Sequence, residues 1–174
     1  MKKLLLLLFL CPYLLAIQCP DKECQLTENW EEESIVPLIT LSPIQSTYSA
    51  GDKVTLTVSV PSNNDFFGGS TNLLENSGDE TGLLVLLSDN LFVDNKLTFS
   101  KGAQGKYENW LELPFNLESG NYEVDVEVTL NRSGEYSVYA EGYVELGSSD
   151  CPDFKLNLNY SGVETEFIEF SVEE

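Results

Sequence analysis

Acidic side chains dominate the chemistry that this sequence could perform. The chain of 174 residues has 29 Asp and Glu, 9 Lys and Arg, and no His. Without an imidazole, Ser-His-Asp or Cys-His catalysis, His-ligated zinc and a histidine pH switch are excluded. Pairs of carboxylates could hydrolyse glycosides or peptides, but no Asp-Thr-Gly or Asp-Ser-Gly motif marks such a pair. We therefore expect a protein that is not an enzyme.

Oxygen-rich segments make calcium the metal that best suits this sequence, since hard cations bind carboxylate and carbonyl oxygens. Two loops, residues 63–65 and 76–80, are rich in Asn and Asp. Neither has the EF-hand spacing, and Asn, Asp and Gly are also ordinary turn residues. Hydrated turns are therefore the alternative to a calcium site, and we expect no other cofactor. The candidate metal ligands are Asp65, Asp79, Glu80, Asp125 and Glu141.

Three aromatic residues form a candidate ligand face. Trp110, Tyr139 and Tyr143 fall out of phase with the apolar residues of their predicted strands, so we expect them to point outward. Exposed aromatic side chains can stack on sugar rings or anchor a partner. The alternative is that the long segment 61–81, which contains Phe66 and Phe67, covers such residues and packs them. Both interpretations stay open at the sequence level.

The charge of the chain restricts its partners. The formal net charge is −20, so a nucleic acid would be repelled by the protein. A glycan or a basic protein partner is compatible with this charge. Contact with a membrane is expected only through a lipid anchor.

The amino terminus predicts export. Lys2 and Lys3 precede an apolar run that ends near Gln18, which is typical of a signal peptide over residues 1–18. A membrane span needs about 20 apolar residues, and this run is interrupted by Pro12. The segment 16–19 is similar to a lipobox, with Cys19 at the acylated position. The acidic residues that follow are similar to those behind the acylated cysteine of surface lipoproteins in Bacteroidota.

Two locations therefore stay open, a surface lipoprotein of the outer membrane and a secreted or periplasmic protein. The number of cysteines bears on this choice, because three of them follow residue 18. If Cys19 carries lipid, Cys24 and Cys151 can form a disulfide in an oxidising compartment. If Cys19 is free, a bridge between Cys19 and Cys24 competes.

Hydrophobic periodicity predicts one all-β domain over residues 35–174, behind an acidic tether over residues 19–34. Residues 53–60 and 122–130 alternate between apolar and polar side chains, as half-buried antiparallel strands do. The run Leu83–Leu87 predicts a central strand that is covered on both faces. No segment of ten or more residues has a helical stripe. Short strands separated by turn residues at this spacing predict a β-sandwich.

The order of the strands predicts one specific pairing. Residues 122–130 and 136–146 are joined by a short turn, so we expect them to form a hairpin. Inward residues must pair with inward residues, and one register that satisfies this rule places Asp125 opposite Glu141. These carboxylates would repel each other or bind a cation.

Three motifs carry a resemblance to known domains. Residues 48–58 resemble the early strand of bacterial Ig-like and PKD-like extracellular domains, and residues 119–124 and 133–140 are similar to their late Gly-x-Tyr-x-Val strand. The whole chain resembles small uncharacterised exported proteins of Bacteroidota. The resemblance implies an Ig-like antiparallel β-sandwich with a non-catalytic role in binding or structural display in the cell envelope. The alternatives are a glycan-binding surface lipoprotein and a calcium-binding adhesion-type module.

Overall fold

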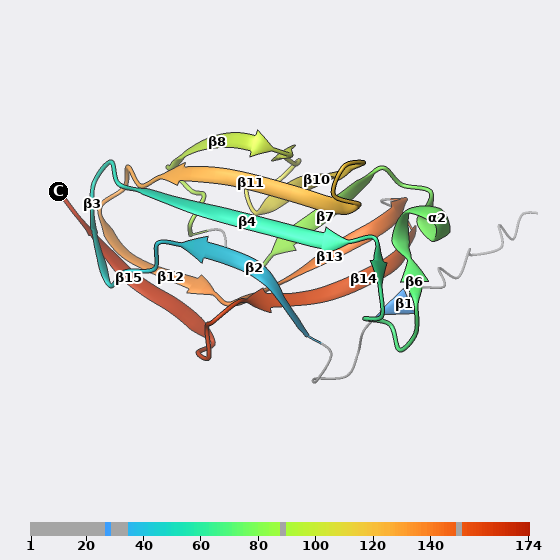
Figure 1. Ribbon diagram of the computed structural model, residues 1–174. Coiled ribbons are helices and arrows are strands. Elements are labelled where there is room, and N and C mark those ends of the chain that lie inside the picture. Colours follow the sequence, from blue (N-terminus) through green and yellow to red (C-terminus); the bar gives the residue numbers. More distant parts are fainter. Residues whose placement is uncertain (1–26, 29–34, 88–89, 149–150) are drawn as a thin grey trace, which may run out of the picture.

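The structure is built almost entirely from strands (Figure 1). This computed structural model describes residues 27–28, 35–87, 90–148 and 151–174. Seven strands form its main closed sheet: β2 (Val36–Ser42), β4 (Lys53–Pro61), β7 (Thr81–Leu86), β10 (Trp110–Asn116), β11 (Asn121–Thr129), β13 (Glu141–Ser148) and β14 (Cys151–Tyr160). The prediction of an all-β protein is confirmed.

The sheet closes because β11 pairs with neighbours on both sides. It runs antiparallel to β4 along its whole length, and Tyr122 near its start lies opposite Phe115 of β10. The order around the barrel is β4, β2, β14, β13, β7, β10 and β11. Strands β14 and β2 are parallel, and the other six neighbouring pairs are antiparallel. The main sheet is therefore a mixed seven-stranded barrel.

Alternating side chains explain why these segments form barrel strands. Successive residues of a strand point to opposite faces, and the inward positions here are apolar. Burial of each such side chain contributes about 1.5–3 kcal/mol. The predicted strands over 53–60 and 122–130 correspond to β4 and β11, and the strand predicted over Leu83–Leu87 is confirmed as far as Leu86, where β7 ends. The inward residues of β4 and β11 are Val54, Leu56, Val58, Val60, Tyr122, Val124, Val126 and Val128.

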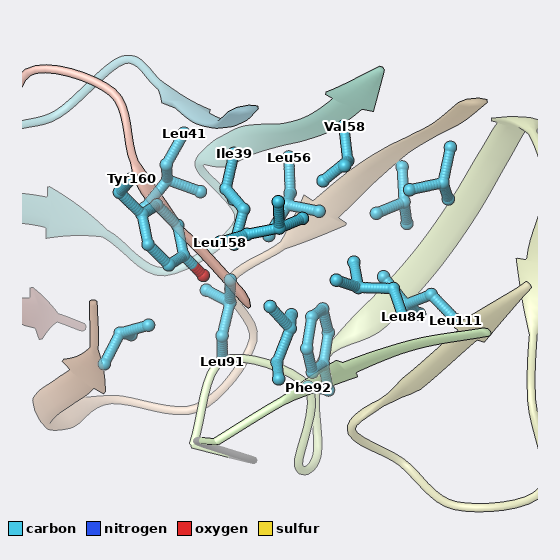
Figure 2. Packing of buried hydrophobic residues seen from close by; sticks show 14 of the residues in the cluster. Ile39, Leu41, Leu56, Val58, Leu84, Leu91, Phe92, Leu111, Leu158 and Tyr160 are labelled. Carbon is cyan, nitrogen blue, oxygen red and sulfur yellow. The ribbon is translucent and has the colours of Figure 1, made fainter. Parts of the chain in front are cut away.

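Figure 2 shows how the interior is filled. Inward side chains from different strands of the barrel, among them Ile39, Leu84 and Leu158, point into the same interior. Leu91 and Phe92 enter the same cluster from the chain that follows β7, and both are buried. The barrel is therefore packed with side chains.

The long segment 61–81 covers one end of this core. It contains β5 (Asn63–Asn64), β6 (Thr71–Asn72) and α2 (Leu73–Ser77), which lies beside β13 and β14. Leu73 is fully buried, and the Phe67 ring packs edge-on against Phe154 with the centroids 5.3 Å apart. The Asn72 side chain caps α2 by accepting from the Glu75 N–H. The interpretation that this segment packs its aromatic residues is correct for Phe66 and Phe67.

A small second sheet extends the core at the other end. It has the order β12 (Gly134–Tyr139), β15 (Phe167–Glu173) and β3 (Thr47–Ser49). Phe170 of the middle strand stacks on Tyr136, with centroids 4.7 Å apart, and contacts the edge of Tyr48. These buried rings join the small sheet to the barrel core.

The expectation of an Ig-like sandwich is wrong, because the main sheet closes on itself. Residues 136–146 are not one strand: the chain leaves the small sheet and enters the barrel at Ala140. The Ala140 N–H donates to the carbonyl of Glu166 beside β15, and its carbonyl accepts from the N–H of Tyr160 at the end of β14. The alternation of apolar and polar residues continues through Ala140, so hydrophobic periodicity cannot reveal that the chain changes sheets there.

The predicted hairpin between residues 122–130 and 136–146 is also wrong. Strand β11 has β4 on one edge, and β10 and β8 (Lys96–Lys101) on the other, so neither edge is open to β12. Asp125 lies opposite Thr57 and Lys101, and Glu141 lies opposite Asn159. The predicted facing pair of carboxylates does not form.

The predicted tether is described only in part. Thr27–Glu28 forms β1, which pairs in parallel with the start of β14. The predicted signal peptide, the lipid attachment site Cys19 and the disulfide partner Cys24 lie outside the described residues. The helix found among the described residues is too short to be a membrane span.

Candidate functional site

A row of three side chains crosses the outer surface of the barrel. Val85 of β7 lies opposite Trp110 of β10 on one side and opposite Tyr143 of β13 on the other. Their neighbours Leu84, Leu111 and Val144 are fully buried inside, so this row points outward. We call Trp110, Val85 and Tyr143, with the adjacent Tyr107 and Leu87, the aromatic face.

The hairpin that leads into β10 positions Trp110. Strand β9 (Ala103–Gln104) pairs with β10, and the Gly105 N–H donates to the Trp110 carbonyl at 2.8 Å. A Cβ atom at Gly105 would lie only 3.0 Å from the Trp110 Cβ, so glycine permits this close approach. Tyr107 then packs edge-on against the Trp110 ring with centroids 4.5 Å apart. This contact restricts the orientation of the indole.

The exposure of the aromatic face shows which groups are available to a ligand. Val85 points outward but is only 6% exposed, so neighbouring side chains cover it. Tyr107 and Leu87 are 50% and 52% exposed. Trp110 and Tyr143 are partly exposed. The face therefore combines a covered centre with accessible aromatic and aliphatic groups.

Charged side chains flank the aromatic face. In the next outward row, Leu83 lies between Glu112 and Glu145, and Lys155 lies beyond Glu145. The Lys155 ammonium lies 4.6 Å from the centroid of the Tyr143 ring, in the range of a cation–π contact. Burial, followed by the charge of Glu145, raises the pKa of the Tyr143 hydroxyl, and Lys155 acts in the opposite direction. This hydroxyl is neutral at neutral pH and both donates and accepts hydrogen bonds.

Tyr139, the third predicted aromatic residue, lies in a different sheet. It belongs to β12 and packs edge-on against Phe167 of β15, with centroids 5.3 Å apart. The charge of Glu141, with smaller contributions from burial and Glu166, raises the pKa of its hydroxyl. The structure thus brings Trp110 and Tyr143 together and leaves Tyr139 apart from them.

The predicted metal ligands are distributed over the molecule. Asp79 uses its carboxylate Oδ2 to accept the N–H of Gly147 at 2.6 Å, and its carbonyl accepts from the Tyr122 hydroxyl. Asp125 and Glu141 lie on different strands that are not neighbours. The Asp65 carbonyl accepts the N–H of Gly68 in a turn, and the Glu80 carbonyl accepts the N–H of Phe115 in β10. In the described part of the chain, no group of three or more His, Cys, Asp or Glu could hold a metal ion.

Sequence reasoning missed Val85, Leu87 and Tyr107. The run Leu83–Leu87 contained the signal, since its alternate residues are apolar where an outer face would normally be polar. Such a run was expected to be covered on both faces. Instead, Leu87 is half exposed beyond the end of β7, where its N–H donates to the Glu141 carbonyl.

Comparisons of this chain with models of protein families, with curated proteins and with solved structures gave no match.

Proposed function

We propose that this protein is an exported, non-catalytic binding protein whose aromatic face takes a neutral glycan. The observation that carries the proposal is the single outward row formed by Trp110, Val85 and Tyr143. A mostly covered apolar centre with a partly exposed aromatic ring on each side offers stacking surfaces for the C–H faces of sugar rings.

The spacing of the two rings suits an extended ligand. Trp110 and Tyr143 lie on strands separated by β7, so their Cα atoms are about 10 Å apart, or two strand spacings. This separation is comparable to the length of a disaccharide. Glu112, Glu145 and Lys155 in the next row supply acceptors and donors for hydroxyl groups. Stacking and hydrogen bonding would therefore act together.

The charge of the protein favours a neutral glycan over an anionic one. A net charge of −20 repels sulfated or uronic acid-rich chains. Glu112 and Glu145 add local negative charge beside the aromatic rings. Neutral oligosaccharides do not incur this repulsion.

Two further features support the non-catalytic and exported parts of the proposal. General acids of glycosidases need a raised carboxyl pKa, whereas hydrogen bonds lower the pKa of the nearly buried Glu123. The pattern of residues 1–18 supports export. Acylation of Cys19 would then attach the protein to the cell surface.

The test is a glycan array probed with the mature chain, in which Trp110→Ala is compared with Tyr139→Ala. Both changes remove an aromatic side chain from an outward strand position, but only Trp110 belongs to the aromatic face. We expect neutral glycans to bind the wild type and Tyr139→Ala, with at least tenfold weaker binding by Trp110→Ala. Equal loss in both variants, or no binding by any glycan, would overturn the proposal.

A further inference from the structure

Strand β11 changes its partner partway along one edge. Tyr122 pairs with Phe115 of β10, whereas Asp125 pairs with Lys101 of β8. Between these positions the two neighbouring strands separate. Gly102, at the end of β8, has a φ of 78°, and a Cβ there would collide with the carbonyl oxygen of Glu112. Glycine therefore permits this close approach of the chain to β10, at the branch point that we call the fork.

The fork contains a cavity of about 340 Å³ on the outer side of the barrel. This volume is at the lower end of the range of about 300–1,000 Å³ that is typical of small-molecule sites. The cavity is lined by Lys101, Pro114, Phe115, Asn116, Leu117 and Glu123. It therefore has a polar part and an apolar part.

Hydrogen bonds within the protein hold the polar part in place. Oε2 of Glu123 accepts from Lys101 Nζ at 2.9 Å and from Asn116 Nδ2 at 2.8 Å. The Asn116 side chain is also fixed by the Glu118 N–H, which donates to its Oδ1 at 2.9 Å. Glu123 is only 9% exposed. An ammonium has three donors, so Lys101 can donate further hydrogen bonds to a ligand without breaking its bond to Glu123.

The apolar part includes an unusually exposed side chain. Leu117 is 89% exposed at the turn between β10 and β11. Phe115 is partly buried and packs edge-on against Tyr122 with centroids 5.3 Å apart. Leu117 and Phe115 thus present an aliphatic and an aromatic surface next to the charged pair.

We propose that the fork cavity binds one ring of a neutral sugar, as a second subsite for the glycan of the aromatic face. The charges of Lys101 and Glu123 are paired. An anion would be repelled by the Glu123 carboxylate, and a cation would compete with the Lys101 ammonium for that carboxylate. A neutral polyol can donate to the carboxylate and accept from the ammonium while its C–H face packs on the apolar wall.

The position of the fork supports a shared ligand. Four residues of β10 alternate with its inward residues and therefore point to the same outer face: Trp110, Glu112, Pro114 and Asn116. Trp110 and Asn116 are six residues apart on one strand, a distance of about 20 Å. An extended oligosaccharide could reach both places. The inference therefore rests on the proposed function, although the cavity could bind a sugar alone.

The test is an NMR titration of the isotope-labelled mature chain with neutral oligosaccharides of glucose, mannose, xylose and N-acetylglucosamine. Wild type, Trp110→Ala, Lys101→Met and Lys96→Met would be compared. Lys96 is the matched control, because it is an exposed lysine at the other end of β8. We expect shifts at the fork that survive Trp110→Ala, and about tenfold weaker binding at the fork in Lys101→Met. Lys96→Met should bind as the wild type does.

The pattern of shifts separates the two proposals. Shifts only around Trp110 and Tyr143 would overturn the fork subsite and leave the aromatic face supported. Shifts only at the fork would support the cavity as a sugar site and overturn the proposed role of the aromatic face. An absence of shifts in both places would overturn both, and equal weakening by Lys101→Met and Lys96→Met would overturn the role given to Lys101.

Discussion

The Lys101 ammonium lies 2.9 Å from the Glu123 carboxylate at the fork of the barrel, and this contact changes the pKa of both groups. Hydrogen bonds from Lys101, and then from Asn116, lower the pKa of Glu123 below 4.5. The same contact raises the pKa of Lys101 above 10.5. Both groups are therefore charged across the neutral range, and the fork is held by an ion pair.

This pair predicts a pH dependence of stability. Because folding lowers the pKa of Glu123, the unfolded chain takes up the proton first as the pH falls. The stabilisation is complete well above pH 4.5 and is lost as the pH falls through 4.5 and then through the lower pKa of the folded state. Glu123→Gln removes this titration, so we expect the stability of the wild type to fall more steeply than that of the variant below about pH 5.

Urea denaturation at a series of pH values measures this difference directly. Glu127→Gln is the matched control, since Glu127 is on the same strand and pairs with Lys53, but is more exposed. The other carboxyl groups titrate in all three proteins and cancel in the comparison. Parallel curves for wild type and Glu123→Gln would show that the pair does not contribute to stability.

A second prediction concerns Asp125. The predicted hairpin would place Asp125 opposite Glu141. In that arrangement, Asp125→Asn would relieve a repulsion between two carboxylates and stabilise the protein. Its observed neighbour across the strand is Lys101, whose pKa is raised in part by the charge of Asp125. We therefore expect Asp125→Asn to lower stability slightly at low ionic strength, and the loss to shrink in salt. Denaturant titrations at two salt concentrations measure both, and a gain in stability would contradict the observed pairing.

A third prediction concerns Tyr160, whose hydroxyl is buried inside the barrel without a hydrogen-bond partner among the described residues. Figure 2 shows its ring within the apolar cluster that includes Ile39 and Leu158. Burial raises the pKa of this hydroxyl. Leaving a buried polar group unsatisfied costs about 1–3 kcal/mol, so Tyr160→Phe should leave the free energy of unfolding unchanged or increase it by up to that amount.

Tyr122→Phe provides the contrast, because the Tyr122 hydroxyl donates to the Asp79 carbonyl at 2.6 Å. Removal of this bond should lower the free energy of unfolding by about 1 kcal/mol. Chemical denaturation of both variants measures the two changes. A loss of more than about 1 kcal/mol in Tyr160→Phe would mean that a buried water or another group satisfies the hydroxyl.

Much of the strand content could be predicted, because alternation reports which side of a strand is buried. Val54 to Val60 and Tyr122 to Val128 show this clearly. The topology could not be predicted, because the inward phase is the same on both sides of Ala140, where the chain changes sheets. Nor does periodicity specify which strands are neighbours, so the pairing of β11 with β4, β8 and β10 was missed.

The candidate site was predictable to a similar extent. The phase of β10 correctly placed Trp110 opposite to Leu111 and Leu113. That Trp110 and Tyr143 share a row depends on β7 lying between them, which is a long-range pairing. The ion pair of Lys101 and Glu123 also depends on long-range strand pairing, because Lys101 is on β8 and Glu123 is on β11.

The last prediction concerns the disulfide between Cys24 and Cys151, which the number of cysteines predicts if Cys19 carries lipid. Thr27 lies opposite Phe154 and Glu28 opposite Lys155 in parallel strands. Cys24 precedes Thr27 by three positions, and Cys151 precedes Phe154 by three. An oxidising compartment would allow these two cysteines to pair. Peptide mapping without reductant should therefore recover Cys24 linked to Cys151.

Stability measurements on Cys24→Ser, Cys151→Ser and the double variant test whether this bridge contributes. A bridge that encloses most of the chain would stabilise it by at most about 4–5 kcal/mol in the chain-entropy model. Each single variant should lose the same amount, the double variant should lose no more, and reductant should abolish the difference from the wild type. A bridge between Cys19 and Cys24 would instead make Cys151→Ser neutral, and additive losses would mean that the two residues contribute separately.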